Sequence, residues 1–228
     1  MGIAKRERDA EVAREAILEA AEEVFAREGF DGARIDTIAA EAGYNKSLLF
    51  HYFGGKEGLY RAIVKKLKAS MGSELMEPLT IFAQSSDEIS AERVRIFLEL
   101  AIGRFFDFLI QHPRNLRMMA WEAAEGWRTF TGGPDKDVEA YRSAIFCIVD
   151  FLQRAQEAGF LNRTIDPRFM MTSIMNICII HLLSIPRFQW IFDNSASELQ
   201  STASMRQQIM QLVLHGILTP SQERIAHE

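Results

Sequence analysis

The feature that most constrains the fold is a short segment between glycine turns, residues 44–53, with Gly43 before it and Gly54 after it. An apolar helix is expected to stop at Gly43, because glycine adopts the left-handed conformation that ends helices. The side chain of Asn45 can then accept a hydrogen bond from a free amide at the start of a second helix. Two helices joined by so tight a turn predict a helix-turn-helix.

The second helix of this pair has two different faces. Leu49 and Phe53 lie four residues apart, so they share one face and suit burial. The opposite face carries a cation, a hydroxyl, an aromatic ring and an imidazole, from Lys46, Ser47, Phe50 and His51. Such a face suits the major groove of DNA, whose base edges offer donors, acceptors and thymine methyl groups. The alternative is one more amphipathic helix, because the helix-turn-helix shape also occurs away from DNA.

Many further positions between residues 12 and 70 follow one recognisable order. They are the run Phe25, Ala26, Arg27, Glu28, Gly29 and Phe30, then Ile35, Ile38, Ala39, Ala42, Gly43, Lys46, Leu49, His51, Tyr52, Phe53, Lys56, Glu57 and Leu59. With these residues the segment resembles the N-terminal DNA-binding domain of the TetR family of bacterial transcriptional regulators.

The resemblance implies roles for individual residues. Tyr52 and Lys56 would contact the DNA backbone, although the alternative for Lys56 is a solvated lysine. Arg34 stands where the family often has Thr or Ser, so it does not cap the next helix in that way but can pair with a phosphate. Leu48 and Phe50 replace the Thr and Tyr common in the family, which shifts the expected readout toward thymine methyl groups and DNA shape. The predicted DNA-binding residues are Arg34, Asn45, Lys46, Ser47, Leu48, Phe50, His51, Tyr52 and Lys56.

The distribution of charge agrees with a DNA partner despite a net charge of -5. Residues 44–70 contain six Lys and Arg against Glu57 alone, a local charge of +5. A phosphate responds to this local field rather than to the acidity elsewhere in the chain.

No strand pattern is visible, so we expect an all-α protein with two domains. Residues 1–70 would form the helix-turn-helix domain, and residues 71–228 a larger effector-binding and dimerisation domain. The polar stretch 71–90, with Gly72 and Pro78, predicts a linker containing at most a short helix. Residues 1–10 are expected to be frayed. Further helices are expected at about 91–111, from 113 onward, and at about 135–158, 169–185 and 204–217, with an apolar loop at 187–192.

The last two helices, 169–185 and 204–217, carry more apolar residues than one core requires. The resemblance implies that they form a four-helix homodimer interface, which would supply the two-fold axis that a palindromic operator needs. The alternative is that they only complete the core of a monomer.

The resemblance also implies a ligand cavity between the middle helices. An aromatic and Met lining with few polar groups would fit a largely apolar small molecule. Its expected residues are Phe105, Trp121, Trp127, Phe146, Phe151, Met175 and His181, each of which plain core packing would also explain.

An enzyme is not indicated. Glu122 and Glu125 share a helix face, and His181 lies in an apolar helix, but no phosphate loop, nucleophile elbow or metal-ligand cluster accompanies them. No catalytic residue, metal or cofactor is therefore predicted. Cys147 and Cys178 have neither paired spacing nor metal-site spacing and are expected to be free thiols.

No segment predicts a membrane protein. The basic N-terminus is not followed by an apolar core, and the longest apolar run, residues 174–185, is too short to cross a bilayer. We therefore expect a cytoplasmic location.

Three functions are compatible with these observations. The first is a TetR-type regulator, most simply a repressor, released from its operator by a small effector. The second is a DNA-binding regulator that answers to a protein partner and has no small-molecule ligand. The third is a helical interaction module that never contacts DNA.

Overall fold

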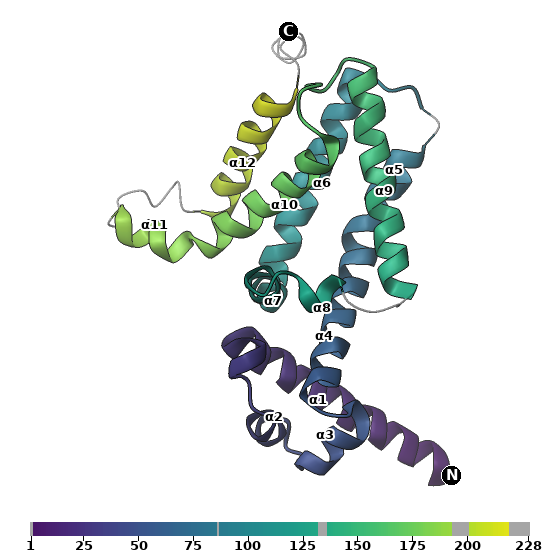
Figure 1. The fold of residues 1–228 in the computed structure, drawn as a ribbon, viewed down its shortest axis with the longest axis vertical. Helices are drawn as coiled ribbons and strands as arrows, with labels where there is room; N and C mark the ends of the chain where they lie inside the picture. Colours follow the sequence, from purple (N-terminus) through teal and green to yellow (C-terminus); the bar gives the residue numbers. More distant parts are fainter. Residues whose placement is uncertain (1, 86, 132–135, 193–200, 219–228) are drawn as a thin grey trace. The chain divides into compact units, whose positions relative to one another are not determined.

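The computed structural model describes residues 2–85, 87–131, 136–192 and 201–218. The regular structure in these ranges is helical, apart from one isolated antiparallel bridge between Leu161 and Leu218. The helices are α1 (Gly2–Gly32), α2 (Ile35–Ala42), α3 (Lys46–Phe53), α4 (Lys56–Met71), the π-helical turn η1 (Gly72–Met76), α5 (Glu77–Gln84), α6 (Ala91–Gln111), α7 (Pro113–Ala124), α8 (Arg128–Thr131), α9 (Lys136–Glu157), α10 (Pro167–Leu183), α11 (Ile185–Ile191) and α12 (Thr202–Ile217). The all-α prediction is confirmed (Figure 1).

The chain forms two compact units. The first contains residues 1–70 together with 112–138, and the second contains residues 71–111 together with 139–228. Residue 70 is thus a boundary in both the sequence-based and the structural division, whereas 112–138 group with the N-terminal unit. The assignment of separate functions to 1–70 and 71–228 stays a prediction.

Residues 71–84 are helical, so the predicted linker at 71–90 was wrong over most of its length. Leu75, Met76 and Leu79 are buried, and this apolar side holds the segment in a helix. Gly72 and Pro78 made the segment look like a turn, yet Pro78 is the second residue of α5, directly after the π-helical turn η1.

Two other segments also differ from expectation. Residues 185–191 form the short helix α11 rather than a loop, with Pro186 in its first turn. The backbone is helical from Gly2 onward, so residues 2–10 are not frayed. Helix formers from Ile3 to Phe25, without an intervening Gly or Pro, account for this long first helix.

An aromatic cluster forms the centre of the N-terminal unit. Phe25 is fully buried, and its ring lies 4.9 Å from the Tyr60 ring and 6.2 Å from the Phe30 ring. Phe30 in turn lies 5.0 Å from Tyr60. These edge and stacked contacts join α1 to α4 and hold the frame against which the helix-turn-helix packs.

The C-terminal unit is built around α6, which contacts α5, α10 and α12. Phe97 of α6 and Phe151 of α9 are both buried, with ring centroids 4.3 Å apart. Gly103 has no side chain where Arg206 of α12 approaches α6, and Arg206 forms an ion pair of 3.1 Å with Asp107.

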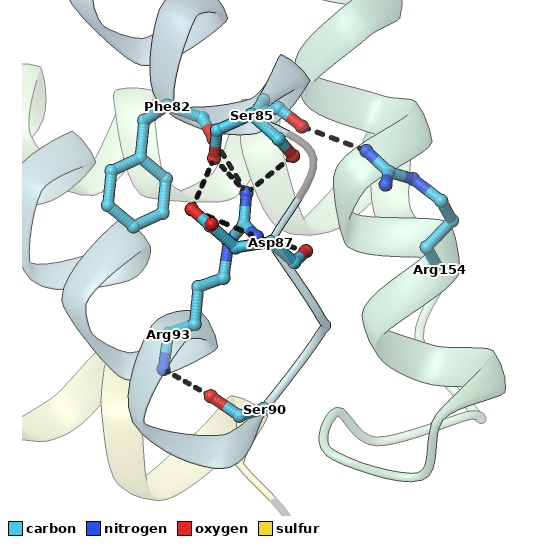
Figure 2. A network of polar contacts seen from close by, with 7 residues as sticks. Phe82, Ser85, Asp87, Ser90, Arg93 and Arg154 are labelled. Carbon is cyan, nitrogen blue, oxygen red and sulfur yellow. Dashed lines mark hydrogen bonds and ion pairs between the residues drawn. The ribbon is translucent and has the colours of Figure 1, made fainter.

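Two arginines close the C-terminal end of α5, as Figure 2 shows. Arg93 is only 8% exposed. Its guanidinium donates to the carbonyl oxygens of Phe82, Ser85 and Asp87 and to the Ser85 hydroxyl. Arg154 of α9 donates to the Ala83 carbonyl at 2.9 Å. The last carbonyls of a helix have no partner within it, so these cations stabilise α5 and fix it to α6 and α9.

Candidate nucleic-acid interface

The turn between α2 and α3 is built as the sequence predicts. Gly43 has φ 73°, and its N–H donates to the Ala40 carbonyl at 3.2 Å, while the Tyr44 N–H donates to Ala39 at 3.0 Å. This left-handed cap ends α2. The Asn45 Oδ1 accepts from the Leu48 N–H at 2.9 Å and begins α3. The predicted helix-turn-helix with an Asn45 cap is confirmed.

The two faces of α3 are also divided as predicted. Leu49 is 1% exposed and anchors the helix, and Phe53 is half-buried under the guanidinium of Arg14 at 5.6 Å. The exposed side chains are those of Lys46, Ser47, Phe50 and His51, with Leu48 and Tyr52 partly exposed. Phe50 is 48% exposed although it is large and apolar. A mixed face of this kind can both donate hydrogen bonds to base edges and contact thymine methyl groups.

A run of glycines fixes the exit from α3. Gly54 and Gly55 have φ values of 72° and 127°, which other residues rarely adopt. At Gly58 a Cβ would lie 1.8 Å from the carbonyl oxygen of Phe53, so no larger residue fits without moving α3 or α4. The orientation of α3 therefore depends on three glycines, of which Gly58 has no local sequence signal for its role.

The lysines near α3 have weak local partners. The Lys46 ammonium lies 3.0 Å from Asp36 Oδ1, but both side chains are more than half exposed, and such pairs contribute little. The Lys56 ammonium donates to the Asp31 carbonyl at 3.1 Å and lies 4.8 Å from the Phe30 ring. Lys56 is thus held in place at the start of α4 instead of being a freely solvated lysine.

Arg34 and Tyr52 flank these groups. Arg34 is exposed at the residue before α2 and makes no side-chain cap, as expected from the replacement of Thr or Ser. Tyr52 is half-buried, with its ring 5.3 Å from that of His51 and 6.3 Å from that of Phe53. Neighbouring rings thus restrict its position, which suits a contact made at one place on a DNA backbone.

A buried carboxylate joins α4 to α7 and α8 within this unit. Glu122 is 2% exposed, accepts from the Tyr60 hydroxyl at 2.8 Å, and accepts from the Phe130 N–H at 2.9 Å. Burial raises the pKa of Tyr60, and the hydrogen bond to Glu122 raises it further. In the sequence, Glu122 stands out only as half of a carboxylate pair with Glu125. No local signal shows that it faces a tyrosine far away in the chain.

Trp121 packs against α1 in the same unit. Its indole N–H donates to the Ala26 carbonyl at 3.3 Å, and its ring lies 3.0 Å from where a Cβ of Gly29 would be. Gly29 has φ 71°, so α1 bends where the ring approaches. Arg114 adds an ion pair of 2.8 Å with Glu23. These contacts explain why α7 groups with the N-terminal unit.

Comparison with known families decides the identity of the chain. Residues 17–63 match the family described as bacterial regulatory proteins, tetR family, and residues 97–213 match the tetracyclin repressor-like C-terminal domain. The second match alone spans just over half of the chain. The chain belongs to the TetR family.

Individual relatives agree with this assignment. The HTH-type transcriptional repressor SCO4008 of Streptomyces coelicolor is 30% identical over 176 residues, covering 76% of this chain and 81% of that protein. The HTH-type transcriptional regulator RutR of Escherichia coli (strain K12) is 31% identical over 122 residues, covering 54% and 53%. The structure of the putative transcriptional regulator SCO4942 from Streptomyces coelicolor shares the fold, with a TM-score of 0.63, 24% identity and coverage of 90% and 98%.

The family assignment narrows the function. This TetR-family chain is a DNA-binding transcriptional regulator and not an enzyme, because its relatives are transcriptional regulators. The alternative of a helical interaction module that never contacts DNA is therefore set aside.

The seven predicted effector residues of this TetR-family chain are divided between the two units. Trp121 and Trp127 belong to the N-terminal unit, where Trp121 contacts α1. Phe146 of α9 is 63% exposed, and Phe151 is fully buried against Phe97. The three others lie in α6 and α10: Phe105, Met175 and His181.

Two hollows in the C-terminal unit involve these last three residues. A cavity of about 40 Å³ lies among α5, α6, α9 and α10, and Phe105 and Met175 contribute to its lining. Its described lining consists only of Leu, Ile, Met, Phe and Ala side chains. A much larger pocket of about 770 Å³ lies along α10, α11 and α12 and includes His181. The Nδ1 of His181 bonds the Ile177 carbonyl at 2.9 Å, as a core histidine would.

The described part of the chain contains neither a metal-ligand cluster nor a single helix that is long and apolar enough to span a membrane. No group of three or more His, Cys, Asp or Glu side chains there is placed to hold a metal ion. No single described helix has the length and hydropathy to cross a membrane, although α10 and α11, bent by 55° at their junction, would satisfy that test together.

Proposed function

We propose that this chain is a ligand-responsive repressor that binds a palindromic operator as a homodimer and is released by a small, largely apolar effector. The observation that carries the proposal is the mixed, exposed face of α3, held between a capped start and a glycine exit. Repression is favoured over activation by the relative SCO4008, a transcriptional repressor. A cytoplasmic location belongs to the same proposal, because the operator lies on the chromosome.

The proposed DNA contacts divide into reading and positioning. Lys46, Ser47, Leu48, Phe50 and His51 would face base edges from α3, with Asn45 setting where that helix begins. Lys46 is exposed enough to exchange Asp36 for a guanine edge, and Phe50 offers an apolar surface to thymine methyl groups. Arg34, Tyr52 and Lys56 would bind phosphates and fix the register. The local charge of +5 over residues 44–70 supports this assignment.

The outward surfaces of α10 and α12 support a homodimer. Residues 169–183 contain no Asp, Glu, Lys or Arg, yet Phe169 and Ile180 are 65% and 58% exposed. On α12, Leu212 is 62% exposed. Depletion of charge with exposed large apolar side chains is typical of the core of a protein interface. A two-fold axis through such a surface would pair two reading helices on a palindrome.

The effector site is proposed at the cavity lined by Phe105 and Met175. Its apolar lining favours an apolar molecule, since a polar group placed there would lose its hydrogen bonds to water. The present volume of about 40 Å³ is far below the several hundred Å³ of typical ligand sites, so binding requires the cavity to open. Met76, Met171 and Met175 line it and have flexible side chains that allow such a change. An effector would release DNA only by its preference for the non-binding state.

The same small volume favours a second candidate function. A regulator controlled by a protein partner, without a small-molecule ligand, would have a filled core of this kind. The two candidates share the DNA-binding role of α3 and differ only in the signal that releases the operator.

Selection of bound fragments from random DNA by the purified chain tests the reading function. A palindrome bound with steep salt dependence supports the proposal, because each phosphate contact releases counterions. Binding that stays blind to sequence after refolding, which removes any co-purified effector, contradicts it. Apolar compounds are then added to the operator complex. Release at saturation supports the ligand-responsive candidate, and unchanged affinity with every compound supports control by a protein partner.

A further inference from the structure

Helix α11 exposes a large aromatic side chain that the described part of the chain leaves largely uncovered. Trp190 is 84% exposed, and the two residues that follow it, Ile191 and Phe192, are 45% and 55% exposed. No residue of α11 is buried. A helix of seven residues has little stability by itself in water, and the described ring contacts of α11 are those of Phe188 with His181 and Phe192. In Figure 1 it leaves the end of α10 and turns away from α6.

The large pocket of about 770 Å³ lies on the other side of the same helix. Ile185, Phe188 and Phe192 contribute to its wall from α11, and Met205 and Leu212 contribute from α12. The described residues that line it include no Asp, Glu, Lys or Arg. Three glutamines and two histidines also line it, so the pocket wall is mostly apolar with neutral polar groups among its side chains.

Helix geometry prevents Trp190 from filling this pocket in its own chain. At about 100° per residue, Phe188 and Phe192 lie on nearly the same side of the helix, and Trp190, midway between them, lies on the opposite side. The side chain that needs an apolar partner and the pocket that needs an occupant thus face away from each other. A second copy related by a two-fold axis satisfies both at once, because the same patch then meets itself.

The geometry points to α11 as an exchanged arm of the homodimer, with Trp190 of each chain inserted into the pocket of about 770 Å³ on the other chain. This inference rests on the homodimer proposed above and adds α11 to the α10 and α12 surfaces, because the pocket that receives Trp190 is itself lined partly by α10 and α12. Buried tryptophans in pockets without charge dominate the binding energy of many interfaces. The stability of the dimer would then depend on α11, a helix that contributes no buried residue to the core of its own chain.

Sedimentation velocity of the full chain over a dilution series measures how much Trp190 contributes to the dimer dissociation constant. Replacing Trp190→Ala is expected to raise the dimer dissociation constant at least about tenfold, the loss typical of an interface hot spot. The matched control is Ile81→Ala, because Ile81 on α5 is 65% exposed and lies outside the pocket lining. It should leave the constant within about twofold.

A third variant distinguishes failure of the exchanged arm from failure of the proposed homodimer. Ile180→Asp places a charge on the exposed surface of α10, outside the pocket, and should dissociate the dimer whether or not the arm is exchanged. If Ile180→Asp dissociates the dimer while Trp190→Ala leaves its constant unchanged, the dimer stands and the exchanged arm is overturned. A wild-type chain that stays monomeric at every concentration overturns both.

Fluorine NMR gives a structural readout that does not depend on a variant folding well. The wild-type chain is labelled with 5-fluorotryptophan, and the Trp190 resonance is assigned from its absence in Trp190→Phe. We expect this resonance to lose its solvent-isotope shift in the dimer and to regain it on dilution to monomer. A Trp190 resonance that keeps the full solvent-isotope shift in the dimer overturns the inference.

Discussion

Helix α3 and the α10–α12 region both expose large apolar side chains, but in different company. On α3, Phe50 is 48% exposed among a cation, a hydroxyl and an imidazole. On α10 to α12, Ile180 and Trp190 are exposed where charged side chains are scarce. A mixed face is stable in water when free and can bind a polar groove. An uncharged face gains most from another protein surface, so the two regions indicate partners of different chemistry.

Two adjacent leucines provide the largest expected contrast on α3. Leu49→Ala removes a side chain that is 1% exposed and should lower the free energy of unfolding by about 2–5 kcal/mol. Leu48→Ala changes a partly exposed side chain on the predicted reading face. It should cost less than about 1 kcal/mol of stability but weaken operator binding by about 1–3 kcal/mol.

Urea unfolding and operator titration on the same two variants check this contrast. If Leu48→Ala bound the operator as tightly as wild type, the exposed face of α3 would not be the reading surface. If Leu49→Ala were fully stable, the assignment of its two faces would be wrong.

The next largest effect concerns the buried contact inside the N-terminal unit. Glu122→Ala leaves the Tyr60 hydroxyl and the Phe130 N–H without their acceptor and should cost about 2–3 kcal/mol. The control is Glu125→Ala, because Glu125 is exposed and should change stability by less than about 0.5 kcal/mol. Equal unfolding free energies for the two variants would show that α7 is not fixed to α4 by this carboxylate.

Lys56 tests the backbone contact proposed near α3. Lys56→Ala should weaken binding to every DNA sequence and reduce the slope of log affinity against log salt by about one unit, because one phosphate contact is lost. Arg61→Ala on α4 is the control, since Arg61 is exposed and paired with Glu57. An unchanged slope for Lys56→Ala would leave this lysine only the structural role of holding Asp31 and Phe30.

The smallest expected effect is a pH dependence carried by Tyr60. Its pKa is raised in the folded chain by burial and by Glu122, so the unfolded chain loses the phenolic proton first. The stabilisation is fully present below about pH 10 and is lost as the pH rises beyond that value. Unfolding free energies between pH 9 and 11 should therefore fall more steeply for wild type than for Tyr60→Phe. Parallel curves would contradict the raised pKa.

The parts of this molecule that the sequence predicted are those specified by near neighbours. Gly43, Asn45 and Gly54 act on residues within one turn, and the helix-turn-helix follows from them. The glycine and proline of 71–84 gave a misleading local signal, because buried Leu75 and Leu79 outweigh them. Burial by distant residues is not visible in a local pattern.

The predicted effector residues stay a prediction, and local patterns specify them less well than the helix-turn-helix. Aromatic, Met and His side chains serve equally as core, surface and cavity wall, so residue type alone does not place them in a ligand site. Phe105 and Met175 line one cavity of the C-terminal unit, while Trp121 packs against Gly29, which is far away in the sequence. The contact between Tyr60 and Glu122 could not be predicted from a local pattern either, since the two residues are 62 positions apart.

The measurement that tests the central claim most directly is discrimination between the selected operator and a scrambled duplex at several salt concentrations. Wild type should prefer the operator by at least about 10³-fold. A variant with Lys46, Leu48 and Phe50 all replaced by Ala, shown by urea unfolding to be folded, should bind both duplexes alike while keeping its salt dependence. If that variant still discriminated as wild type does, the exposed face of α3 would not be what reads the DNA.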